Sequence, residues 1–533
     1  MNYPSIFNDV LGPVMRGPSS SHCAASLRIG RLCRDLMDGD IKEVLIEYDP
    51  NGSLATTHKG QGSDMGLFGG FLGWEAHDER LPDYLKAVKA AGMDIQIEIH
   101  DIQADHPNTY KISLKNAREE RKMIALSTGG GMIEVIEIDG APLFMAGDYY
   151  ETLIYLKKGS SILDYLNSLG EFDEIIEHAG EMDFVEIKAQ EFLSEEIMQE
   201  LEAMEEVLFI KKLAPVLPIM SRQGLKVPFI SCEEMLAYNK DKDLELWELA
   251  IEYESMRGNI SKLEVIDRMR ELVGIMQKSI DYGLLGTEYA DRILGNQSKG
   301  FQEKMEADSL VHNEVLNKII LYVTAMMEVK SAMGVIVAAP TAGACGALPG
   351  AVLGARAAMN LPEEEAIKAM LAAGMIGVFI SAHATFAAEV GGCQAECGSG
   401  SGMAAAAIVH LGGGNLSQSI SASSQALQNS LGMICDPIAN RVEAPCLGKN
   451  IMAASNALSC ANMALANYDH LIPLDEVIET MDKVGKSIPN DLRCTTLGGL
   501  SITKTSKEIE ARLAANAGEG AEIQLSPSRF KVC

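Results

Sequence analysis

The apolar and polar positions of roughly the first 150 residues follow strand and helix patterns in turn. Residues 44–49 (VLIEYD) and 93–102 (MDIQIEIHDI) are strand-like runs, whereas residues 81–92 (LPDYLKAVKAAG) read as a helix. Such an alternation is typical of a mixed fold. We therefore predict an N-terminal α+β domain over residues 1–149.

Residues 150–216 show a compact pattern of strand, helix, strand, strand, helix, strand. The predicted strands are TLIYLK, DEIIEHAG, DFVEIKA and VLFIKKL, and the helices are SSILDYLNSL and SEEIMQELEAM. This βαββαβ order resembles the ACT domain, a small regulatory module that binds amino acids in many metabolic enzymes. The glycine-rich ligand loop of such domains is reduced here to residues 157–161 (KKGSS), so a dimerisation or docking role is equally open.

Helix signals dominate residues 217–533, for which we predict a mostly α-helical domain. Ser231 and Ser261 are each followed three residues later by a glutamate, the pattern of a capping box. The density of Ala and Gly over residues 335–466 indicates closely packed helices. The apolar run at residues 370–388 carries Ser381, His383 and Thr385 and is weakly hydrophobic, so we expect a buried helix, or two helices meeting near the glycines, and no membrane span.

Composition narrows the classes of function. A chain of 533 residues with 47% hydrophobic content can form two or three cores. The net charge of −29 and the lack of basic runs argue against nucleic acid and anionic membranes as partners. The start, MNYPSIFNDV, lacks the features of an export signal, so we expect a cytoplasmic protein with reduced cysteines.

Cysteines in turns rich in Gly and Pro provide the first candidate chemistry. Cys345 lies in GACG, Cys435 in ICDP and Cys446 in APC. Three thiolates can hold an iron–sulfur cluster and leave one iron open to act as a Lewis acid. The alternative is that these residues, among 11 cysteines in the chain, are small buried hydrophobes.

Four longer motifs identify a family resemblance. They are residues 11–30 (LGPVMRGPSSSHCAASLRIG), 331–350 (SAMGVIVAAPTAGACGALPG), 389–399 (EVGGCQAECGS) and 434–450 (ICDPIANRVEAPCLGKN). Together they resemble the iron–sulfur-dependent L-serine dehydratases, with the usual β and α parts fused in one chain. The resemblance covers most of the chain apart from roughly residues 150–230.

The resemblance implies a [4Fe-4S] cluster held by Cys345, Cys435 and Cys446. The final residue, Cys533, is a possible tail ligand that plugs the open iron when substrate is absent. Cys393 and Cys397 form a C-x3-C pair, but the family motif around them resembles a glycine turn lining the site. We expect the remaining cysteines to be packing residues: Cys23, Cys33, Cys232, Cys460 and Cys494.

The same resemblance assigns the substrate side of the site to the N-terminal domain. The PSSSH turn, residues 18–22, precedes a helix and can hold a carboxylate with hydroxyl and N–H groups, although plain capping is an alternative. The glycine clusters at residues 59–64 and 127–135 allow close approach of an anion or are simple turns. Candidates for catalysis are His22, His58 and His106, and those for substrate binding are Ser19, Ser20, Ser21, Gln61, Ser63, Ser127, Gly129 and Gly130.

Three positions depart from the family pattern. Gln61 stands in KGQGSD where the family commonly has a histidine, and glutamine cannot take a proton near neutral pH. His58 supplies the imidazole if its loop turns back; otherwise it is a solvated loop residue. Cys23 replaces a threonine, and ATFAAEVGGC differs from the family's ATISGAEGGC. These changes bear on the substrate more than on the reaction.

The implied function is an oxygen-sensitive L-serine ammonia-lyase that converts serine to pyruvate and ammonia, a step of amino-acid degradation. No lysine context resembles a pyridoxal phosphate site, Lys299 being the nearest candidate. Elimination from another β-hydroxy or β-thiol amino acid or from a hydroxy acid, and a non-catalytic sensor of redox state or amino acids, remain alternatives. A zinc site on Cys393 and Cys397 is disfavoured, because the sequence offers no second close pair of ligands to complete four. We expect a small-molecule amino-acid substrate and a homo-oligomer, namely a dimer.

Overall fold

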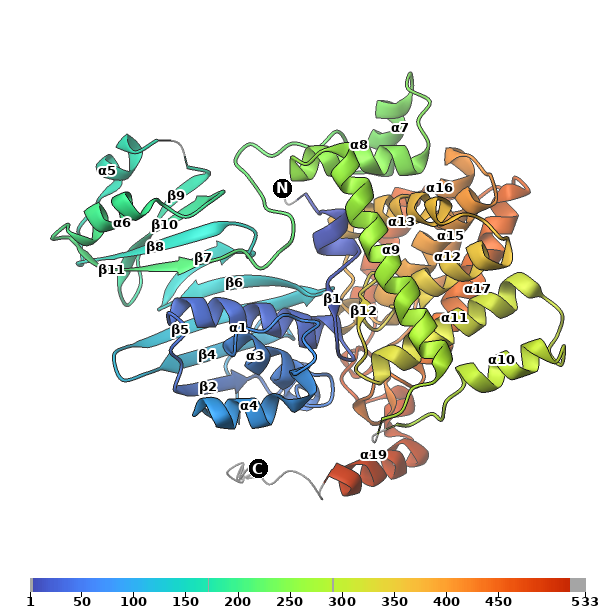
Figure 1. Cartoon of the computed structure of the whole chain (residues 1–533), viewed down its shortest axis with the longest axis horizontal. Helices are drawn as coiled ribbons and strands as arrows, with labels where there is room; N and C mark the ends of the chain where they lie inside the picture. The colour runs from blue at the N-terminus through green and yellow to red at the C-terminus, as the bar shows by residue number, and fades with distance from the viewer. Residues whose placement is uncertain (1–2, 171, 290–291, 518–533) are drawn as a thin grey trace.

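The computed structural model describes residues 3–170, 172–289 and 292–517. Two sheets lie on one side of the molecule and a helical region lies on the other (Figure 1). The short strands β1 (Val14–Met15) and β12 (Ile336–Val337) pair where the two sides meet. The multidomain α/β architecture agrees with the prediction from sequence.

The larger sheet has six strands in the order β3-β2-β4-β5-β6-β7. Strands β2 and β3 are parallel and the other neighbours are antiparallel. Every second side chain of β5 is buried, because one face of the sheet packs on helices. The elements are β2 (Glu43–Tyr48), β3 (Asp94–Ile99), β4 (Thr109–Lys115), β5 (Glu120–Gly129), β6 (Met132–Ile138), β7 (Ala141–Met145), α1 (Ala25–Leu36), α2 (Leu54–Thr57), α3 (Ser63–Phe71) and α4 (Tyr84–Ala91).

Helices α1 and α3 pack with their backbones in contact. A Cβ atom on Gly70 would lie 2.3 Å from the carbonyl oxygen of Leu27, and one on Gly30 would lie 2.3 Å from that of Leu67. Because α1 follows the PSSSH turn directly, this contact fixes where that turn lies relative to the sheet.

The smaller sheet has four antiparallel strands in the order β11-β8-β10-β9. Its two helices pack through apolar side chains such as Leu166 and Leu201. The elements are β8 (Tyr150–Leu156), α5 (Leu163–Ser168), β9 (Glu174–His178), β10 (Asp183–Ala189), α6 (Glu195–Glu202) and β11 (Val207–Leu213). This is the order of strands and helices that the sequence pattern indicated.

The rest of the described chain is helical. The side chains of Ser231 and Ser261 accept hydrogen bonds from the backbone N–H groups of Glu234 and Glu264, so both predicted N-caps are present. The helices are α7 (Cys232–Asn239), α8 (Leu246–Gly258), α9 (Lys262–Leu285), α10 (Ser298–Glu306), α11 (Glu314–Ser331), α12 (Ala347–Ala358), α13 (Glu363–His383), α14 (Ala388–Gly391), α15 (Ser399–Leu411), α16 (Leu416–Ser430), α17 (Cys446–Leu465), α18 (Leu474–Ser487) and α19 (Lys504–Ala517).

Helix α13 contains most of the long apolar run. It is the one helix in the described part of the chain whose length and composition would suit a membrane span. Its most apolar window is 78% buried inside the protein, against neighbours that include α8 and α15. The structure therefore agrees with the predicted buried helix, and α14 begins only after a break at residues 384–387.

The N-terminal segment inserts into the helical region, which the sequence did not suggest. The one-turn helix η1 (Ile6–Val10) lies on α13, where Ile6 contacts Gly374 and Val10 contacts Gly377. The hydroxyl of Ser5 donates a hydrogen bond to the buried carboxylate of Glu254. The chain thus begins in the helical part and then crosses to the larger sheet.

The contact between α1 and α3 predicts a sharp difference between two glycine substitutions. Gly70→Ala should destabilise the protein by about 1–3 kcal/mol, because the added methyl group overlaps backbone atoms of α1. Gly274→Ala, in α9, should stabilise it by roughly 0.5–1 kcal/mol, because no atom lies within 4 Å of the added Cβ. The midpoint temperatures of thermal unfolding of the two variants and the parent would test this. An unchanged midpoint for Gly70→Ala would contradict the close packing of α1 on α3.

Candidate functional site

A group of buried cysteines lies in the helical region near Glu396. The ligand atoms of Cys393, Glu396 and Cys435 all lie within 4.8 Å of one another. Cys397 and Cys494 belong to the same buried cluster as Cys393 and Cys435. This group combines soft thiol donors with one carboxylate, a donor set that suits a thiolate-bound metal centre.

Local backbone structure holds these cysteines together. Cys393 lies between α14 and the short helix η4 (Gln394–Gly398), after Gly392, which has a φ of 72°. Cys435 and Cys494 are joined because the N–H of Cys494 donates to the carbonyl of Cys435 at 2.9 Å. Cys446 is the first residue of α17. Four separate segments therefore meet at one place.

The thiols influence one another's ionisation. Hydrogen bonds from Cys397 and Cys435 lower the pKa of Cys393 well below its usual value, and the nearby Lys449 acts in the same direction. The pKa of Cys446 is raised by burial first and by the charge of Cys393 second, so Cys446 also lies close to this group. A thiolate is thus favoured at Cys393.

The four cluster ligands predicted from the sequence do not all lie together in the structure. Cys435 lies in the cysteine group and Cys446 lies close to it. Cys345 is not part of the Cys393–Glu396–Cys435 set found among the described residues; its sulfur faces that of Met327 at 3.9 Å. Cys533 lies outside the described residues. Cys393, which the sequence motif suggested only as part of a turn, is at the centre of the group.

The PSSSH turn of the N-terminal part docks directly beside this group. The hydroxyl of Ser21 donates a hydrogen bond of 2.8 Å to Glu389, which lies four residues before Cys393. The backbone N–H of Ala342 donates to the hydroxyl of Ser20 at 3.2 Å. The two halves of the chain therefore meet beside the cysteine group.

The imidazole of His22 is enclosed by this turn. Its Nε2 lies 2.8 Å from the hydroxyl of Thr57, and its Nδ1 lies 3.1 Å from that of Ser19 and 3.3 Å from the carboxylate of Glu389. Burial lowers the pKa of His22, and the negative charge of Glu389 partly opposes this. Both ring nitrogens are occupied, which suits an orienting role.

His58 has a different arrangement. Its Nδ1 lies 2.8 Å from Asp64, and its Nε2 makes no hydrogen bond within the part of the chain that the structure describes. The side chain is buried, so the alternative of a solvated loop histidine is wrong. A carboxylate that orients one imidazole nitrogen and leaves the other free is the arrangement of a general base.

Gln61 and Ser63 follow His58, Gln61 in the connection between α2 and α3 and Ser63 as the first residue of α3. The amide of Gln61 donates to Asn440 at 3.0 Å and to the sulfur of Cys494 at 3.4 Å, so this residue joins the loop to the cysteine group. Ser63 instead lies 3.0 Å from the hydroxyl of Tyr110. Among these candidates, Gln61 reaches the site and Ser63 supports its wall.

The predicted residues just before β4 and at the end of β5 complete the N-terminal side. His106 feels the charge of Glu389, and burial lowers its pKa. Ser127 donates a hydrogen bond of 2.7 Å to the carbonyl of Ser21. Gly129 has a φ of 109° and approaches Ala387 so closely that a Cβ would lie 2.9 Å away. The glycine turn that includes Gly130 thus forms a close contact between the two halves.

Two buried side chains at the site have unsatisfied polar atoms. Within the described residues, neither amide atom of Asn108 has a hydrogen-bond partner, and the same holds for Oε2 of Glu389. Buried polar atoms without partners are rare and are expected where a ligand supplies the missing bonds. Neither residue was predicted, although Asn108 lies two residues after His106 and Glu389 is the first residue of the motif at residues 389–399.

Comparison with known proteins agrees with this architecture. Residues 241–501 match the serine dehydratase alpha chain family. The probable L-serine dehydratase alpha chain of Bacillus subtilis is 35% identical over 289 residues, 54% of this chain and 96% of that protein. The probable beta chain of the same organism is 32% identical over 222 residues, 40% of this chain and 100% of that protein.

A single-chain relative spans both parts. L-serine dehydratase 1 of Escherichia coli is 26% identical over 501 residues, which are 91% of this chain and 96% of the relative. The matches to separate alpha and beta chains, and to a single chain that covers both, agree with the predicted fusion. This chain therefore belongs to the serine dehydratase family.

Proposed function

We propose that this protein is an L-serine ammonia-lyase that converts L-serine to pyruvate and ammonia. The observation that carries the proposal is the hydrogen bond from Ser21 to Glu389, which joins the predicted substrate-binding turn to the cysteine group. The names of its relatives, which are L-serine dehydratases, support the same activity.

We further propose that Cys393, Cys435 and Cys446 hold a [4Fe-4S] cluster. Their thiols are soft donors, they come together in a buried region, and the pKa of Cys393 is lowered. In this ligand set Cys393 replaces Cys345, whose sulfur lies against Met327. When bound, such a cluster supplies a Lewis acid for the β-hydroxyl of the substrate.

The chain's own residues would bind and orient the amino acid. The hydroxyls and N–H groups of the turn at residues 19–21 suit the substrate carboxylate, because they lie at the start of the helical segment that continues into α1. The free oxygen of Glu389 suits the ammonium group, and the unpaired amide of Asn108 suits a further polar contact. Ser127 and Gly129 would hold the turn in place.

Removal of the Cα proton needs a base, and we assign this role to His58. Asp64 orients its Nδ1 and leaves Nε2 free to accept the proton. His22, with both nitrogens hydrogen-bonded, would keep the serine turn in shape, and His106 would line the site near Glu389. Gln61 lacks an acid–base function at neutral pH but can hydrogen-bond.

Gln61 also supports a second candidate substrate class. It stands where relatives commonly carry a histidine and lies against Asn440 and Cys494. A pocket altered at this position suits β-elimination from a different β-hydroxy or β-thiol amino acid, or from a hydroxy acid. Assays on such substrates decide between the two.

The four-stranded sheet over residues 150–216 is proposed as an ACT-like domain. Its order β11-β8-β10-β9, with α5 and α6 on the connections, supports that interpretation. Such modules often pair, so we propose a homodimer. Light scattering of the intact protein would test the assembly.

The activity is tested by anaerobic reconstitution with iron and sulfide. We expect rapid formation of pyruvate from L-serine and loss of activity in air, because an open iron is exposed to oxidants. L-threonine, L-cysteine and β-hydroxy acids would be assayed in parallel. A reconstituted cluster without serine turnover would contradict the proposal, and turnover of another compound in the panel would favour the second candidate.

The ligand set is tested by single Cys→Ser variants. Cys393→Ser, Cys435→Ser and Cys446→Ser should each lose the visible absorption of the cluster and the activity, because each removes a thiolate. Cys345→Ser should keep both. Cys33→Ser, buried in the N-terminal core, is the matched control. Loss of the cluster in Cys345→Ser with its retention in Cys393→Ser would restore the ligand set predicted from sequence.

The base is tested with His58→Gln, which keeps a hydrogen bond to Asp64 possible. We expect kcat to fall roughly 100- to 10,000-fold while the absorption of the cluster is unchanged, since general-base catalysis contributes an effect of this size. His312→Gln, at an exposed position, serves as the control. A kcat within about twofold of the parent would assign the base elsewhere.

A further inference from the structure

A cavity that is separate from the cysteine group opens where three parts of the chain meet. Its volume is about 390 Å³, within the range of small-molecule sites. Its walls come from residues 11–14, helix α1, residues 75–77, the connection at residues 215–218 and helix α9. None of the ten cysteines in the described part of the chain lines it.

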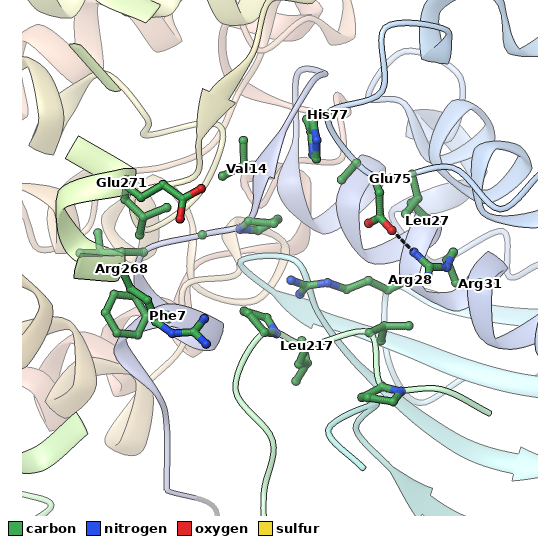
Figure 2. A pocket seen from close by; sticks show the side chains of 18 residues that line it. Phe7, Val14, Leu27, Arg28, Arg31, Glu75, His77, Leu217, Arg268 and Glu271 are labelled. Carbon is green, nitrogen blue, oxygen red and sulfur yellow. Dashed lines mark hydrogen bonds and ion pairs between the residues drawn. The ribbon is translucent and has the colours of Figure 1, made fainter. Parts of the chain in front are cut away.

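The cavity contains a buried cation without an ion-pair partner. Arg28 is 6% exposed, and within the described residues no carboxylate lies within ion-pair distance of it. Within the part of the chain that the structure describes, its side chain donates hydrogen bonds only from Nη1, to the carbonyl of Gly131 and the sulfur of Met132, so Nε and Nη2 have none. Figure 2 shows the guanidinium reaching from α1 toward the middle of the cavity. The charges of Asp9 and Glu75 act on Arg28 from beyond ion-pair distance, but burial still lowers its pKa. A buried charge without a direct partner is costly unless a ligand completes it.

The other charged side chains in the cavity indicate which charged groups a ligand would have. Arg31 is paired with Glu75, and Arg268 is paired with Glu264. Glu271 extends from α9 on the side opposite Arg28 and makes no ion pair within the described residues (Figure 2). One free guanidinium facing one free carboxylate suits a carboxylate and an ammonium on the same small molecule. A dianion such as phosphate would be repelled by Glu271 and Glu75.

Apart from His77, the remaining side chains that line the cavity are apolar. Between the two charges lie side chains that suit a hydrocarbon group better than a hydroxyl. They are Phe7, Leu11, Val14, Leu27, Leu217 and Leu272. The cavity therefore differs in chemistry from the serine turn and its hydroxyl groups.

Arg28 connects this cavity to the candidate active site. Its hydrogen bond to Gly131 holds the glycine turn whose Gly129 packs on Ala387, two residues before Glu389. Ser127, at the start of the same turn, holds the carbonyl of Ser21. A ligand that draws the guanidinium toward itself would act on both contacts.

We propose that this cavity binds a free α-amino acid with an apolar side chain, and that its occupancy alters turnover through the turn at residues 127–131. The carboxylate would pair with Arg28 and the ammonium with Glu271. The binding part of this proposal stands apart from the proposed function, whereas the effect on turnover rests on it.

Titration calorimetry on the intact, anaerobically purified protein tests binding, with L-leucine as the probe. We expect saturable binding, at least tenfold weaker binding of 4-methylpentanoate, which lacks the ammonium group, and no binding of phosphate. Glu271→Gln should weaken L-leucine binding at least tenfold, and Leu272→Trp should abolish it by filling the cavity. Leu263→Trp, exposed on the same helix, is the matched control and should bind normally.

The same variants distinguish a failure of the proposed binding site from a failure of its proposed effect on turnover. Absence of saturable L-leucine binding, or binding that survives both Glu271→Gln and Leu272→Trp, would overturn the site. L-leucine should also change kcat or KM for L-serine by about fivefold or more in the parent and not in Leu272→Trp. Unchanged kinetics at saturating L-leucine would overturn the coupling and leave the measured binding as it stands.

Discussion

The contact between Ser21 and Glu389 is the constraint on which the rest of the site depends. It joins a turn of the N-terminal part to the segment that carries Cys393, and both groups are buried. A hydrogen bond to a buried carboxylate is stronger than one between neutral groups, because the charge is poorly solvated. The close packing of α1 on α3 and the docking of η1 on α13 both serve to hold this contact in register.

The arrangement divides the chemistry between the two halves. The helical part brings together thiols from segments that are far apart in the sequence. A backbone hydrogen bond joins residues 435 and 494, and the start of α17 places Cys446. The N-terminal part contributes hydroxyl, imidazole and amide groups on three loops. The relatives include separate alpha and beta chains, each matching one half, as well as a single chain that matches both.

Much of the fold and part of the candidate site were predictable from the sequence, and the features that were not have physical causes. The strand and helix order of the sheets follows from apolar periodicity, and the motifs named loops that the structure brings close to the cysteine group. Cys393 and Cys345 both lie in glycine-rich turns, so local sequence could not tell which sulfur faces Cys435 and which faces Met327. Glu389 and Asn108 were missed because their role appears only when buried atoms are found without partners. The insertion of η1 depends on two glycines of α13 more than 360 residues away.

The central claim is that the serine turn and the thiol-bound iron form one site. Mössbauer spectroscopy of protein reconstituted with ⁵⁷Fe, before and after anaerobic addition of L-serine, tests it most directly. The account predicts that one iron of the cluster changes its spectrum when L-serine binds, and that Ser21→Ala greatly weakens this response without loss of the cluster. An intact cluster whose spectrum is the same with and without saturating L-serine would contradict it.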